Sequence, residues 1–562
     1  MSETLAIAIA QLNPHVGKID ANLAKLRAAR ATAAEQGADV LVTTELAICG
    51  YPPEDLVVKP MFLDRIEAAV REFAAETGDG GPAVILGAPW REDPETRKRP
   101  KENGVLYNAA LLLDGGEIKA VRAKWDLPNY GVFDEKRLFT PGPLPGPMNV
   151  RGVRLGIMVC EDMWSGDVTE CLEENGASLL ISINSSPFED GKQDQRLQLA
   201  LQRIEESGLP LLYVNQVGGQ DELVFDGASF ALDAGRNLRV QLPAFEETVA
   251  LTRWEADSLG DWGVSEAPRA AQPEGVEAIY KALMLGLRDY VGKNGFPGVV
   301  LGLSGGVDSA LSAVIAADAL GPDKVHCVMM PSPYTSRESL DDAAEQAELI
   351  GARLDSINIG PAMDAFSTML QPLFGDLPPG ITEENLQSRA RGVTLMAISN
   401  KFGPMVLSTG NKSEMSVGYA TLYGDMCGGF NVLKDVYKTT AYALARWRNQ
   451  QVPQGALGNT GRVMPERIIT KAPTAELKPD QKDEDSLPPY DHLDDILTCL
   501  IEGDLGLPEI AARGHDGAVV RKVWHLLEGA EYKRRQAPPG VKITPRSFGR
   551  DRRYPITNGF RG

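Results

Sequence analysis

Short apolar runs alternate with amphipathic stretches along the first half of the chain. Thr4–Gln11 (TLAIAIAQ) alternates apolar and small residues, which predicts a strand. Asp20 is expected to cap the following helix and Gly37 to end it, and the DGG string at 114–116 is typical of a hairpin turn. Because strands are interleaved with helices, the pattern predicts an α/β layered domain. Further strands are expected at residues 39–43, 83–86, 109–113, 154–159, 178–183 and 211–214.

The second half repeats the alternation with longer helices. A helix is expected over residues 273–293, and a buried strand at 299–303 (VVLGL) leads into a glycine-rich turn and an apolar helix. Strands at 325–330 and 354–359 continue the series. This rhythm of strand, helix and strand fits a doubly wound parallel sheet, which binds nucleotides at the carboxyl ends of its strands.

An acidic, irregular region lies between the halves and contains Pro268 and Pro273. Within it we expect a last strand, then a connector, and then the helix that begins near Pro273. Its apolar residues, such as Leu251 and Trp254, favour a packed connector over a flexible tether. The chain is therefore predicted to have three parts. These are a first domain at 1–245, a connector at 246–275 and a second domain at 276–562.

Composition excludes several classes of protein. The 562 residues are 43% hydrophobic and 24% charged, which excludes wholesale disorder. The formal net charge of −20 argues against a general nucleic-acid binder, which needs a basic face. Residues 533–562 are the exception, with nine basic residues and one acid. This segment is either a solvated tail or an arm that reaches an anionic ligand.

The sequence carries no sign of a membrane or secreted protein. No apolar run reaches the roughly 18 residues of a membrane span, and the first residues lack the features of a signal peptide. The six cysteines form no Cys-x-x-Cys pair. We therefore expect a soluble cytoplasmic enzyme with reduced thiols.

Three residues with complementary chemistry follow predicted strands in the first half. Glu45 follows VLVTT, Lys124 follows EIKAVRA and Cys160 follows RLGIMV. A thiol is mostly protonated at neutral pH, so a carboxylate is needed to remove its proton. A nearby ammonium then stabilises the thiolate and an oxyanion. Each residue alone is more often core or loop, although the chemistry of the three together is coherent.

The strings around these residues resemble the nitrilase, or carbon–nitrogen hydrolase, superfamily. They are TTELAICGYPPEDL, KWDLPNYGVFDEKRLF and GIMVCEDMW, in family order. The resemblance implies an αββα sandwich with Glu45 as general base, Lys124 as oxyanion stabiliser and Cys160 as nucleophile. It also implies that the carboxylate of Glu135 helps to position the site. Glutaminase members of this superfamily hold glutamine at positions matched here by Tyr130, Ser186 and Lys192.

A glycine-rich string, GVVLGLSGGVDSAL, is the strongest local signal of the second half. Glycines let backbone N–H groups approach phosphate oxygens, and the following helix adds its dipole. No Lys precedes Ser309, so this is not a Walker A loop, and Asp308 offers a carboxylate for Mg²⁺. The string is similar to the pyrophosphatase loop of ATP-dependent adenylating enzymes. That resemblance implies ATP contacts from Gly302, Leu303, Ser304, Gly305, Gly306, Val307, Asp308 and Ser309.

Further strings in the second half resemble the NAD synthetases. They are ENLQSRAR, VLSTGNKSE, LYGD, KDVYKT and EYKRRQ. The resemblance implies that Thr409 contacts ATP and that Asp308 and Glu414 bind Mg²⁺. Contacts with deamido-NAD+ are implied for Asn385, Glu414 and Lys533. Arg389, Arg391 and Asp425 lie in matching strings and are weaker candidates.

A nitrilase-like domain ahead of this module is the arrangement of the glutamine-dependent NAD+ synthetases. The resemblance implies ATP-dependent amidation of deamido-NAD+ to NAD+, the final step of NAD+ biosynthesis, through an adenylated intermediate. Ammonia from L-glutamine would pass between the sites, and a homo-oligomer without nucleic-acid or membrane partners is expected. The charged, proline-rich segment 471–490 predicts a mobile surface loop, which in this family closes over the adenylation site.

Other functions stay open at this point. One is a nitrilase-type amidase with a regulatory nucleotide-binding tail, and another is an ATP-sensing scaffold without catalysis. Related loops occur in enzymes that amidate GMP or aspartate, or that thiolate tRNA. The last would need a basic face, which this chain lacks outside residues 533–562.

Overall fold

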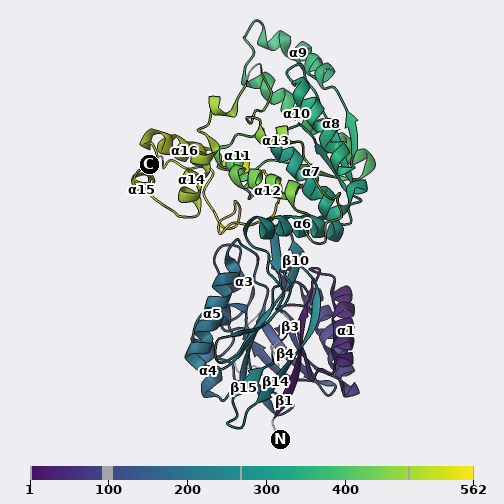
Figure 1. Cartoon of the computed structure of the whole chain (residues 1–562), viewed down its shortest axis with the longest axis vertical. Coiled ribbons are helices and arrows are strands. Elements are labelled where there is room, and N and C mark those ends of the chain that lie inside the picture. The colour runs from purple at the N-terminus through teal and green to yellow at the C-terminus, as the bar shows by residue number, and fades with distance from the viewer. Residues whose placement is uncertain (1–2, 92–104, 266, 268, 479–480, 561–562) are drawn as a thin grey trace. The chain divides into compact units, whose positions relative to one another are not determined.

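The computed structural model describes all of the chain except residues 1–2, 92–104, 266, 268, 479–480 and 561–562. Pro268, one of the two prolines of the expected connector, therefore lies outside the described residues. The chain divides into two compact units (Figure 1). The first combines Met1–Gln220 with Val224–Pro273, and the second combines Asp221–Leu223 with Glu274–Gly562. Within the described parts of the chain, every helix is too short or too polar to span a lipid bilayer.

The first unit contains a seven-stranded mixed sheet. Its strand β1 has the bounds that the alternating pattern predicted, and every residue from Leu5 to Gln11 is buried. β1 pairs in parallel with β2 and antiparallel with β14, so it is an interior strand of the sheet. In sheet order the strands are β15 (Trp262–Val264), β14 (Thr248–Ala256), β1 (Thr4–Gln11), β2 (Val40–Val42), β3 (Ala83–Arg91), β4 (Leu106–Asp114) and β5 (Glu117–Ala123).

A second sheet of six strands packs against the first. Ile7 and Ile85 of the first sheet share one apolar core with Ile157 and Ile181 of the second. Strands β7, β8 and β9 run in parallel, so their carboxyl ends lie at one edge. In sheet order the strands are β13 (Leu238–Gln241), β12 (Phe230–Leu232), β9 (Leu211–Asn215), β8 (Leu179–Asn184), β7 (Val153–Val159) and β6 (Met148–Val150). A separate hairpin joins β10 (Val217–Gln220) to β11 (Leu223–Asp226).

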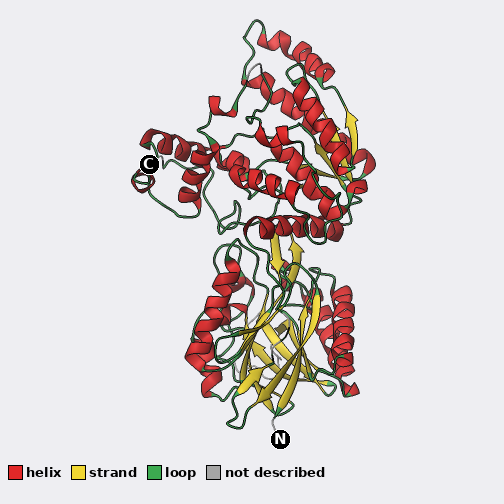
Figure 2. Cartoon of the chain, in the orientation of Figure 1, coloured by secondary structure: helices red, strands yellow, loops and turns green. Residues whose placement is uncertain are grey.

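Helices cover the outer faces of both sheets, which confirms the αββα arrangement (Figures 1 and 2). The first sheet is covered by α1 (Ile19–Glu35) and α2 (Pro60–Glu76), and the second by α4 (Asp167–Glu174) and α5 (Lys192–Ser207). Asp20 lies in the first turn of α1 and does not cap it, because the helix begins two residues earlier than expected, with Lys18 at the cap position. Short helical segments are η1 (Glu54–Val58), η2 (Thr77–Asp79), α3 (Glu135–Leu138) and η3 (Cys160–Met163).

The connector expected at residues 246–275 is wrong in its first part. Strand β14 pairs with the whole length of β1, from Glu255 opposite Thr4 to Thr248 opposite Gln11. The charged residues Arg253 and Glu255 made this stretch look irregular. They occupy the exposed side of a strand whose neighbouring positions, including Trp254, are buried. Both β14 and β15 therefore belong to the first unit.

The second unit is organised around a parallel sheet of five strands, as predicted. Strand β16 lies in the middle, with β17 and β18 on one side and β19 and β20 on the other. The strand order therefore changes direction at β16, and its carboxyl end is the switch point where such sheets bind ligands. In sheet order the strands are β18 (Arg353–Ser356), β17 (Val325–Met329), β16 (Val299–Gly302), β19 (Met405–Ser408) and β20 (Phe430–Asn431).

Helix α7 is almost wholly buried because other helices and the sheet surround it. This explains its largely apolar sequence, ALSAVIAADAL, in which Ser312 and Asp318 are the polar exceptions. The helices of this unit are α6 (Gly275–Asn294), α7 (Val307–Leu320), α8 (Arg337–Ile350), α9 (Gly360–Phe374), α10 (Ile381–Phe402), α11 (Lys412–Val417), α12 (Lys438–Gln450), α13 (Glu466–Thr470), α14 (Tyr490–Ile501), α15 (Leu507–Ala511), α16 (Gly517–Gly529) and α17 (Glu531–Arg534). The turns η4 (Pro322–Lys324) and η5 (Asp483–Asp485) complete it.

The basic segment 533–562 is not simply a solvated tail. Lys542 and Arg552 are buried, at 2% and 6% exposure. The Arg552 guanidinium lies 2.6 Å from the Glu528 carboxylate, and Lys542 Nζ lies 3.4 Å from Asp551 Oδ2. Much of the local positive charge is therefore neutralised inside the second unit.

Candidate active sites

The three predicted catalytic residues follow three strands of the first unit. Glu45 lies in the turn after β2, Lys124 directly follows β5 and Cys160 directly follows β7. The buried Lys124 Nζ lies 2.8 Å from Glu45 Oε1. Cys160 is also buried, and the charges of Glu45 and Lys124 both shift its pKa. The fold thus brings together residues that lie 36 to 115 positions apart in the sequence.

Glu45 is held from several sides. Besides Lys124, the Asn108 side-chain amide donates to Glu45 Oε1 at 2.7 Å. The Ser185 backbone N–H donates to Glu45 Oε2 at 3.1 Å, and the Ser185 hydroxyl donates to the Glu45 carbonyl at 3.0 Å. Glu45 is 0% exposed, so these contacts replace water around its carboxylate.

Glu135 forms the other side of the Lys124 contact. Both of its carboxylate oxygens lie 3.0 Å from Lys124 Nζ, and the Tyr51 hydroxyl donates to Oε1 at 2.9 Å. Burial raises the pKa of Glu135 to about 7, with the Glu45 charge adding to the effect and Lys124 opposing it. The ammonium is therefore enclosed by two carboxylates, and all three side chains are buried.

Cys160 occupies a strained position at the end of its strand. Its φ is +49°, in the left-handed region that residues with a side chain seldom adopt. Asp162 secures this turn, since its Oδ2 accepts from the Val159 N–H at 3.0 Å. Its Oδ1 accepts from the N–H groups of Trp125 and Asp126, at 3.0 and 2.9 Å. Asp162 thus joins the Cys160 turn to the segment that follows Lys124.

The electrostatic environment keeps the Cys160 thiol protonated at rest. Burial raises the pKa of Cys160 well above its usual range, the Glu45 charge raises it further, and only Lys124 opposes them. A protonated thiol is a weak nucleophile, so attack requires a base that takes the proton as the new bond forms. Glu45, held in the same buried cluster, is suited to that role.

The three predicted glutamine-binding residues lie around this cluster. The Tyr130 hydroxyl donates to Glu161 Oε1 at 3.0 Å, next to the nucleophile, and the Tyr130 side chain is half-exposed. Ser186 is buried beside the segment that holds Glu45. Lys192 begins α5, with its Nζ 3.2 Å from Glu189 Oε2 and 5.5 Å above the Trp164 ring.

In the second unit, the predicted phosphate loop lies at the switch point of the sheet. Gly305 has a φ of +78°, and an added Cβ would lie 2.5 Å from the Ser339 carbonyl oxygen, so only glycine fits there. The hydroxyls of Ser304 and Ser309 lie 3.0 Å apart, and Ser304 Oγ accepts from the Gly306 N–H at 3.2 Å. These bonds shape the loop just before α7 begins.

The two predicted metal ligands lie on either side of an ammonium group. Lys438 Nζ lies 2.5 Å from Asp308 Oδ2 and 3.0 Å from Glu414 Oε1. The Asn411 amide also donates to Asp308 Oδ1 at 3.1 Å. Burial raises the pKa of Glu414 to about 7, with the Asp308 charge adding and Lys438 opposing. The two carboxylates are thus close enough to share one cation.

A cavity of about 420 Å³ opens at this site within the second unit. All the predicted ATP-loop residues except Gly305 line it, as do Thr409, Asn385, Glu414 and Lys533. Lys533 Nζ donates to the carbonyls of Gly418 and Ala420, both at 2.7 Å. Of the weaker candidates, Arg391 and Asp425 line the cavity, whereas Arg389 donates to the Leu422 carbonyl at 3.2 Å.

The predicted loop at 471–490 borders the same cavity. Residues 471–477 line it together with Gln481 and Asp483, while 479–480 lie outside the described residues. The Glu476 carboxylate accepts from the hydroxyls of Ser336 and Ser339, both at 2.8 Å. The loop is therefore fixed to the first turn of α8 in this structure, and its mobility stays a prediction.

Sequence reasoning missed four residues that complete these sites. Asn108 was hidden in the apolar run LYNAALLL, where a lone buried amide is itself a signal of a polar partner. Tyr51 and Lys438 lay in strings already singled out, GYPPEDL and KDVYKT, without a role. Ser185 contacts the Glu45 carboxylate through its backbone N–H, which no side-chain pattern predicts.

Comparison with known proteins defines both units. The carbon–nitrogen hydrolase family model matches residues 6–263, and the NAD synthase model matches residues 279–537. The buried Glu–Lys–Cys cluster and the phosphate loop lie within these respective regions. The molecule is thus a carbon–nitrogen hydrolase joined to an NAD synthase module.

Full-length relatives are more specific. The chain is 48% identical to the glutamine-dependent NAD(+) synthetase of Rhodobacter capsulatus and 44% identical to that of Acinetobacter baylyi. The first match covers 100% of both chains, and the second covers 100% of this chain and 99% of its relative. The solved glutamine-dependent NAD+ synthetase of Acinetobacter baumannii, a complex with ADP, is 42% identical over 99% of each chain, with a TM-score of 0.78. This chain belongs to the glutamine-dependent NAD+ synthetases, which make NAD+ from deamido-NAD+ in an ATP-dependent reaction.

Proposed function

We propose that the first unit hydrolyses L-glutamine and that the second unit uses the ammonia to amidate an adenylated form of deamido-NAD+. One observation carries this proposal. A single chain combines a buried Glu45–Lys124–Cys160 cluster with a glycine-rich loop at the switch point of a parallel sheet. Neither the amidase with a regulatory tail nor the non-catalytic scaffold accounts for full-length membership of this family.

The first reaction releases ammonia from the side-chain amide of glutamine. Cys160 Sγ attacks the amide carbon while Glu45 takes the thiol proton, and Lys124 stabilises the negative oxygen of the tetrahedral intermediate. Glu45 then gives its proton to the leaving nitrogen, and ammonia departs from a thioester. Water activated by Glu45 hydrolyses the thioester to glutamate and restores the thiol. Tyr130, Ser186 and Lys192 hold the polar end of glutamine.

The second reaction converts a poor electrophile into a good one. The nicotinate carboxylate of deamido-NAD+ attacks the α-phosphorus of ATP, and pyrophosphate leaves. Ammonia then attacks the acyl carbon of the adenylate, loses a proton, and displaces AMP to give the amide of NAD+. The loop from Gly302 to Ser309 and Thr409 bind ATP, and Asn385, Glu414 and Lys533 bind deamido-NAD+. The cavity that all but Gly305 line supports this division of roles.

Mg²⁺ is proposed to bind with ATP at Asp308 and Glu414. Mg²⁺ sites of this kind use one or two protein carboxylates together with phosphate oxygens. The residues fit this requirement, because the two carboxylates are near enough to share one cation, Lys438. Bound there, Mg²⁺ would neutralise phosphate charge. Lys438 itself supplies a fixed ammonium beside the same phosphates.

Joining the two activities in one chain has a chemical reason. Free ammonia is mostly protonated at neutral pH, and ammonium has no lone pair for attack on the adenylate. We propose that ammonia passes directly from one unit to the other, which avoids this protonation. A homo-oligomer and a cytoplasmic location stay predictions, and light scattering on the purified protein tests the first.

The decisive assay measures NAD+ formed from deamido-NAD+ and ATP, with either glutamine or ammonium as nitrogen source. The wild type is expected to use both. In Cys160→Ala, the rate of NAD+ formation with glutamine should fall at least about 100-fold, while the rate with ammonium is retained. Equal loss with both sources in a folded variant would contradict separate sites. Direct transfer would be contradicted if an added amine trap captured all the ammonia made from glutamine.

A further inference from the structure

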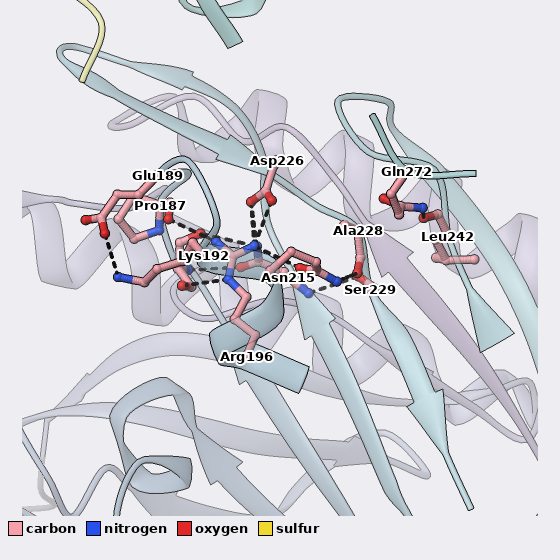
Figure 3. Close-up of polar contacts among 12 residues, drawn as sticks. Pro187, Glu189, Lys192, Arg196, Asn215, Asp226, Ala228, Ser229, Leu242 and Gln272 are labelled. Carbon is pink, nitrogen blue, oxygen red and sulfur yellow. Dashed lines mark hydrogen bonds and ion pairs between the residues drawn. The ribbon is translucent and has the colours of Figure 1, made fainter. Parts of the chain in front are cut away.

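A buried arginine without a role in the chemistry above organises the wall of the glutamine site. Arg196 lies one turn after Lys192 on α5, and its side chain is 1% exposed (Figure 3). Its Nη1 donates to both oxygens of Asp226, at 2.8 and 2.7 Å, and its Nε donates to Ser186 Oγ at 3.2 Å. Its Nη2 donates to the carbonyls of Ser186 and Pro187, both at 2.9 Å.

A buried guanidinium is stable only when its charge is neutralised and its N–H groups have hydrogen-bond acceptors. The Asp226 carboxylate, from the end of β11, neutralises the charge, and the carbonyls of the 186–187 segment satisfy donors that water cannot reach. An Arg fork makes these bonds in fixed directions, so it defines where both carbonyls lie. The result is a rigid link between α5 and the segment after β8.

Ser186 is fixed from a third direction as well. Asn215, the last residue of β9, accepts from the Ser186 N–H at 2.9 Å and donates to its carbonyl at 3.2 Å. The Asn215 amide also lies 3.4 Å from Asp226 Oδ1 (Figure 3). Backbone and side chain of Ser186 are thus both set by one buried network.

The segment held in this way has two tasks. Ser185 binds the carboxylate and the carbonyl of Glu45, and the next residue, Ser186, is a predicted glutamine contact. Lys192, a second predicted contact, is on the same helix as Arg196. Arg196 therefore fixes the spacing between Ser186 and Lys192.

We propose that Arg196, paired with Asp226, is a positioning residue that sets the affinity of the first unit for glutamine. It acts by holding Ser186 at a fixed distance from Lys192, and does not itself contact the reacting atoms. The proposal rests on the proposed glutaminase function. It assigns the arginine to substrate binding, and leaves the chemical step to the Glu45–Lys124–Cys160 cluster.

The test compares the full-length wild type with Arg196→Lys, Ser186→Ala and the double variant. Lysine keeps the charge but cannot span Asp226 and two carbonyls together. Arg196→Lys is expected to raise the KM for glutamine about 10-fold, with kcat changed less than about 3-fold and the ammonium-driven rate unchanged. If the arginine acts through Ser186, its effect should largely disappear in the Ser186→Ala background.

Arg30→Lys is the matched control, because Arg30 is a buried arginine of the same unit that pairs with Asp79 and the Pro82 carbonyl. It should leave the KM for glutamine within about 2-fold of the wild type. If Arg196→Lys does not fold, as judged by its ammonium-driven rate and thermal unfolding, Asp226→Asn carries the same expectation.

Three results would overturn the proposal. They are an unchanged KM in a folded variant, a loss confined to kcat, and effects of Arg196→Lys and Ser186→Ala that simply multiply. A wild type that made no NAD+ from glutamine would instead contradict the proposed function, whatever the variants did. The two failures are therefore distinguishable in one set of assays.

Discussion

At the scale of single residues, burial and neighbouring charges in the first unit determine which group can stabilise an oxyanion and which can accept a proton. Burial disfavours the ammonium of Lys124, yet the charges of Glu135 and Glu45 outweigh it and raise the Lys124 pKa well above its usual range. Lys124 therefore stays charged and is suited to stabilising an oxyanion, not to accepting a proton. The base must then be a carboxylate, and Glu45 lies in contact with the ammonium.

The raised pKa of Glu135 should make the free energy of unfolding depend on pH. Its pKa is about 7 in the folded protein and about 4.5 when unfolded, because burial disfavours its charge. The folded state then binds more protons between these values, so this group makes the protein less stable as pH rises from about 4.5 to 7. Glu135→Gln lacks this carboxyl and should not show the trend. Between pH 4.5 and 7, the free energy of unfolding of the variant should therefore rise by about 3 kcal/mol relative to that of the wild type.

Thermal unfolding at pH 5 and pH 7.5 measures this shift. Glu35→Gln is the control, since Glu35 is an exposed residue at the end of α1, and its difference from the wild type should stay constant with pH. A Glu135→Gln difference that is equally constant would show that folding does not raise the pKa of the Glu135 carboxyl.

Single residues also show where sequence reasoning stops. Glu45, Lys124 and Cys160 were predictable because each follows a strand within a distinctive string. Asn108 and Lys438 were not, because their importance depends on which charges the fold places beside them. A lysine at the start of a helix is usually solvated, and only the structure shows Lys438 between two carboxylates.

At the scale of elements, three helices of the second unit are joined by one buried ion pair. Arg448 of α12 contacts both oxygens of Asp318 on α7, at 2.6 and 3.0 Å, and the Tyr280 hydroxyl of α6 donates to the same carboxylate at 2.6 Å. Arg448 and Asp318 are 0% and 1% exposed. The amino ends of α7 and α12 carry Asp308 and Lys438, so this pair fixes the helices that supply the ATP site.

Replacing one partner of that pair should destabilise the protein more than replacing both. Arg448→Met leaves Asp318 charged and buried, and is expected to destabilise the second unit by about 3–5 kcal/mol. The double variant Arg448→Met/Asp318→Leu removes the orphaned charge and should recover part of this loss. Urea unfolding, together with the ammonium-driven rate, measures both. A double variant less stable than Arg448→Met would contradict the argument.

Helices and strands were predictable where a local pattern of apolar residues defines them. β1 and β5 have the bounds that their apolar patterns indicated. A last strand was expected in the region between the halves but was not placed, so β14 was assigned to the connector. It carries charges on its exposed side, and its identity depends on pairing with β1, 237 to 251 residues away in the sequence. Local pattern therefore defines strands well, but it does not show which distant strand they join.

At the scale of the whole molecule, the net charge of −20 conceals an internal balance. Basic residues near the C-terminus are buried against acids of the second unit, as Arg552 is against Glu528. The segment after Gly540 also contacts the helix that carries Glu414. Thr544 Oγ lies 2.6 Å from Nζ of Lys412, the first residue of α11, and 2.9 Å from Asp435 Oδ2. The same helix carries Glu414, so the C-terminal segment supports the synthetase site.

Deleting residues 541–562 should therefore abolish NAD+ synthesis and spare glutamine hydrolysis, the reverse of the effect expected for Cys160→Ala. The deletion removes the buried side chains of Val541 and Ile543 and leaves Lys412 and Asp435 without Thr544, which disturbs α11. Ammonium-driven NAD+ synthesis is expected to fall below about 1% of the wild type, because Glu414 loses its fixed position. Glutamine hydrolysis, measured as glutamate released, should persist, because its catalytic residues lie in the first unit.

A chain ending at Asn558 is the matched control, since it retains both Thr544 and the Arg552–Glu528 pair and should keep both activities. If the chain ending at Gly540 made NAD+ from ammonium at the wild-type rate, the C-terminal segment would not support the synthetase site. Loss of glutamine hydrolysis along with synthesis would show instead that the first unit depends on an intact second unit. The two deletions therefore test whether this chain contains two independently folded catalysts.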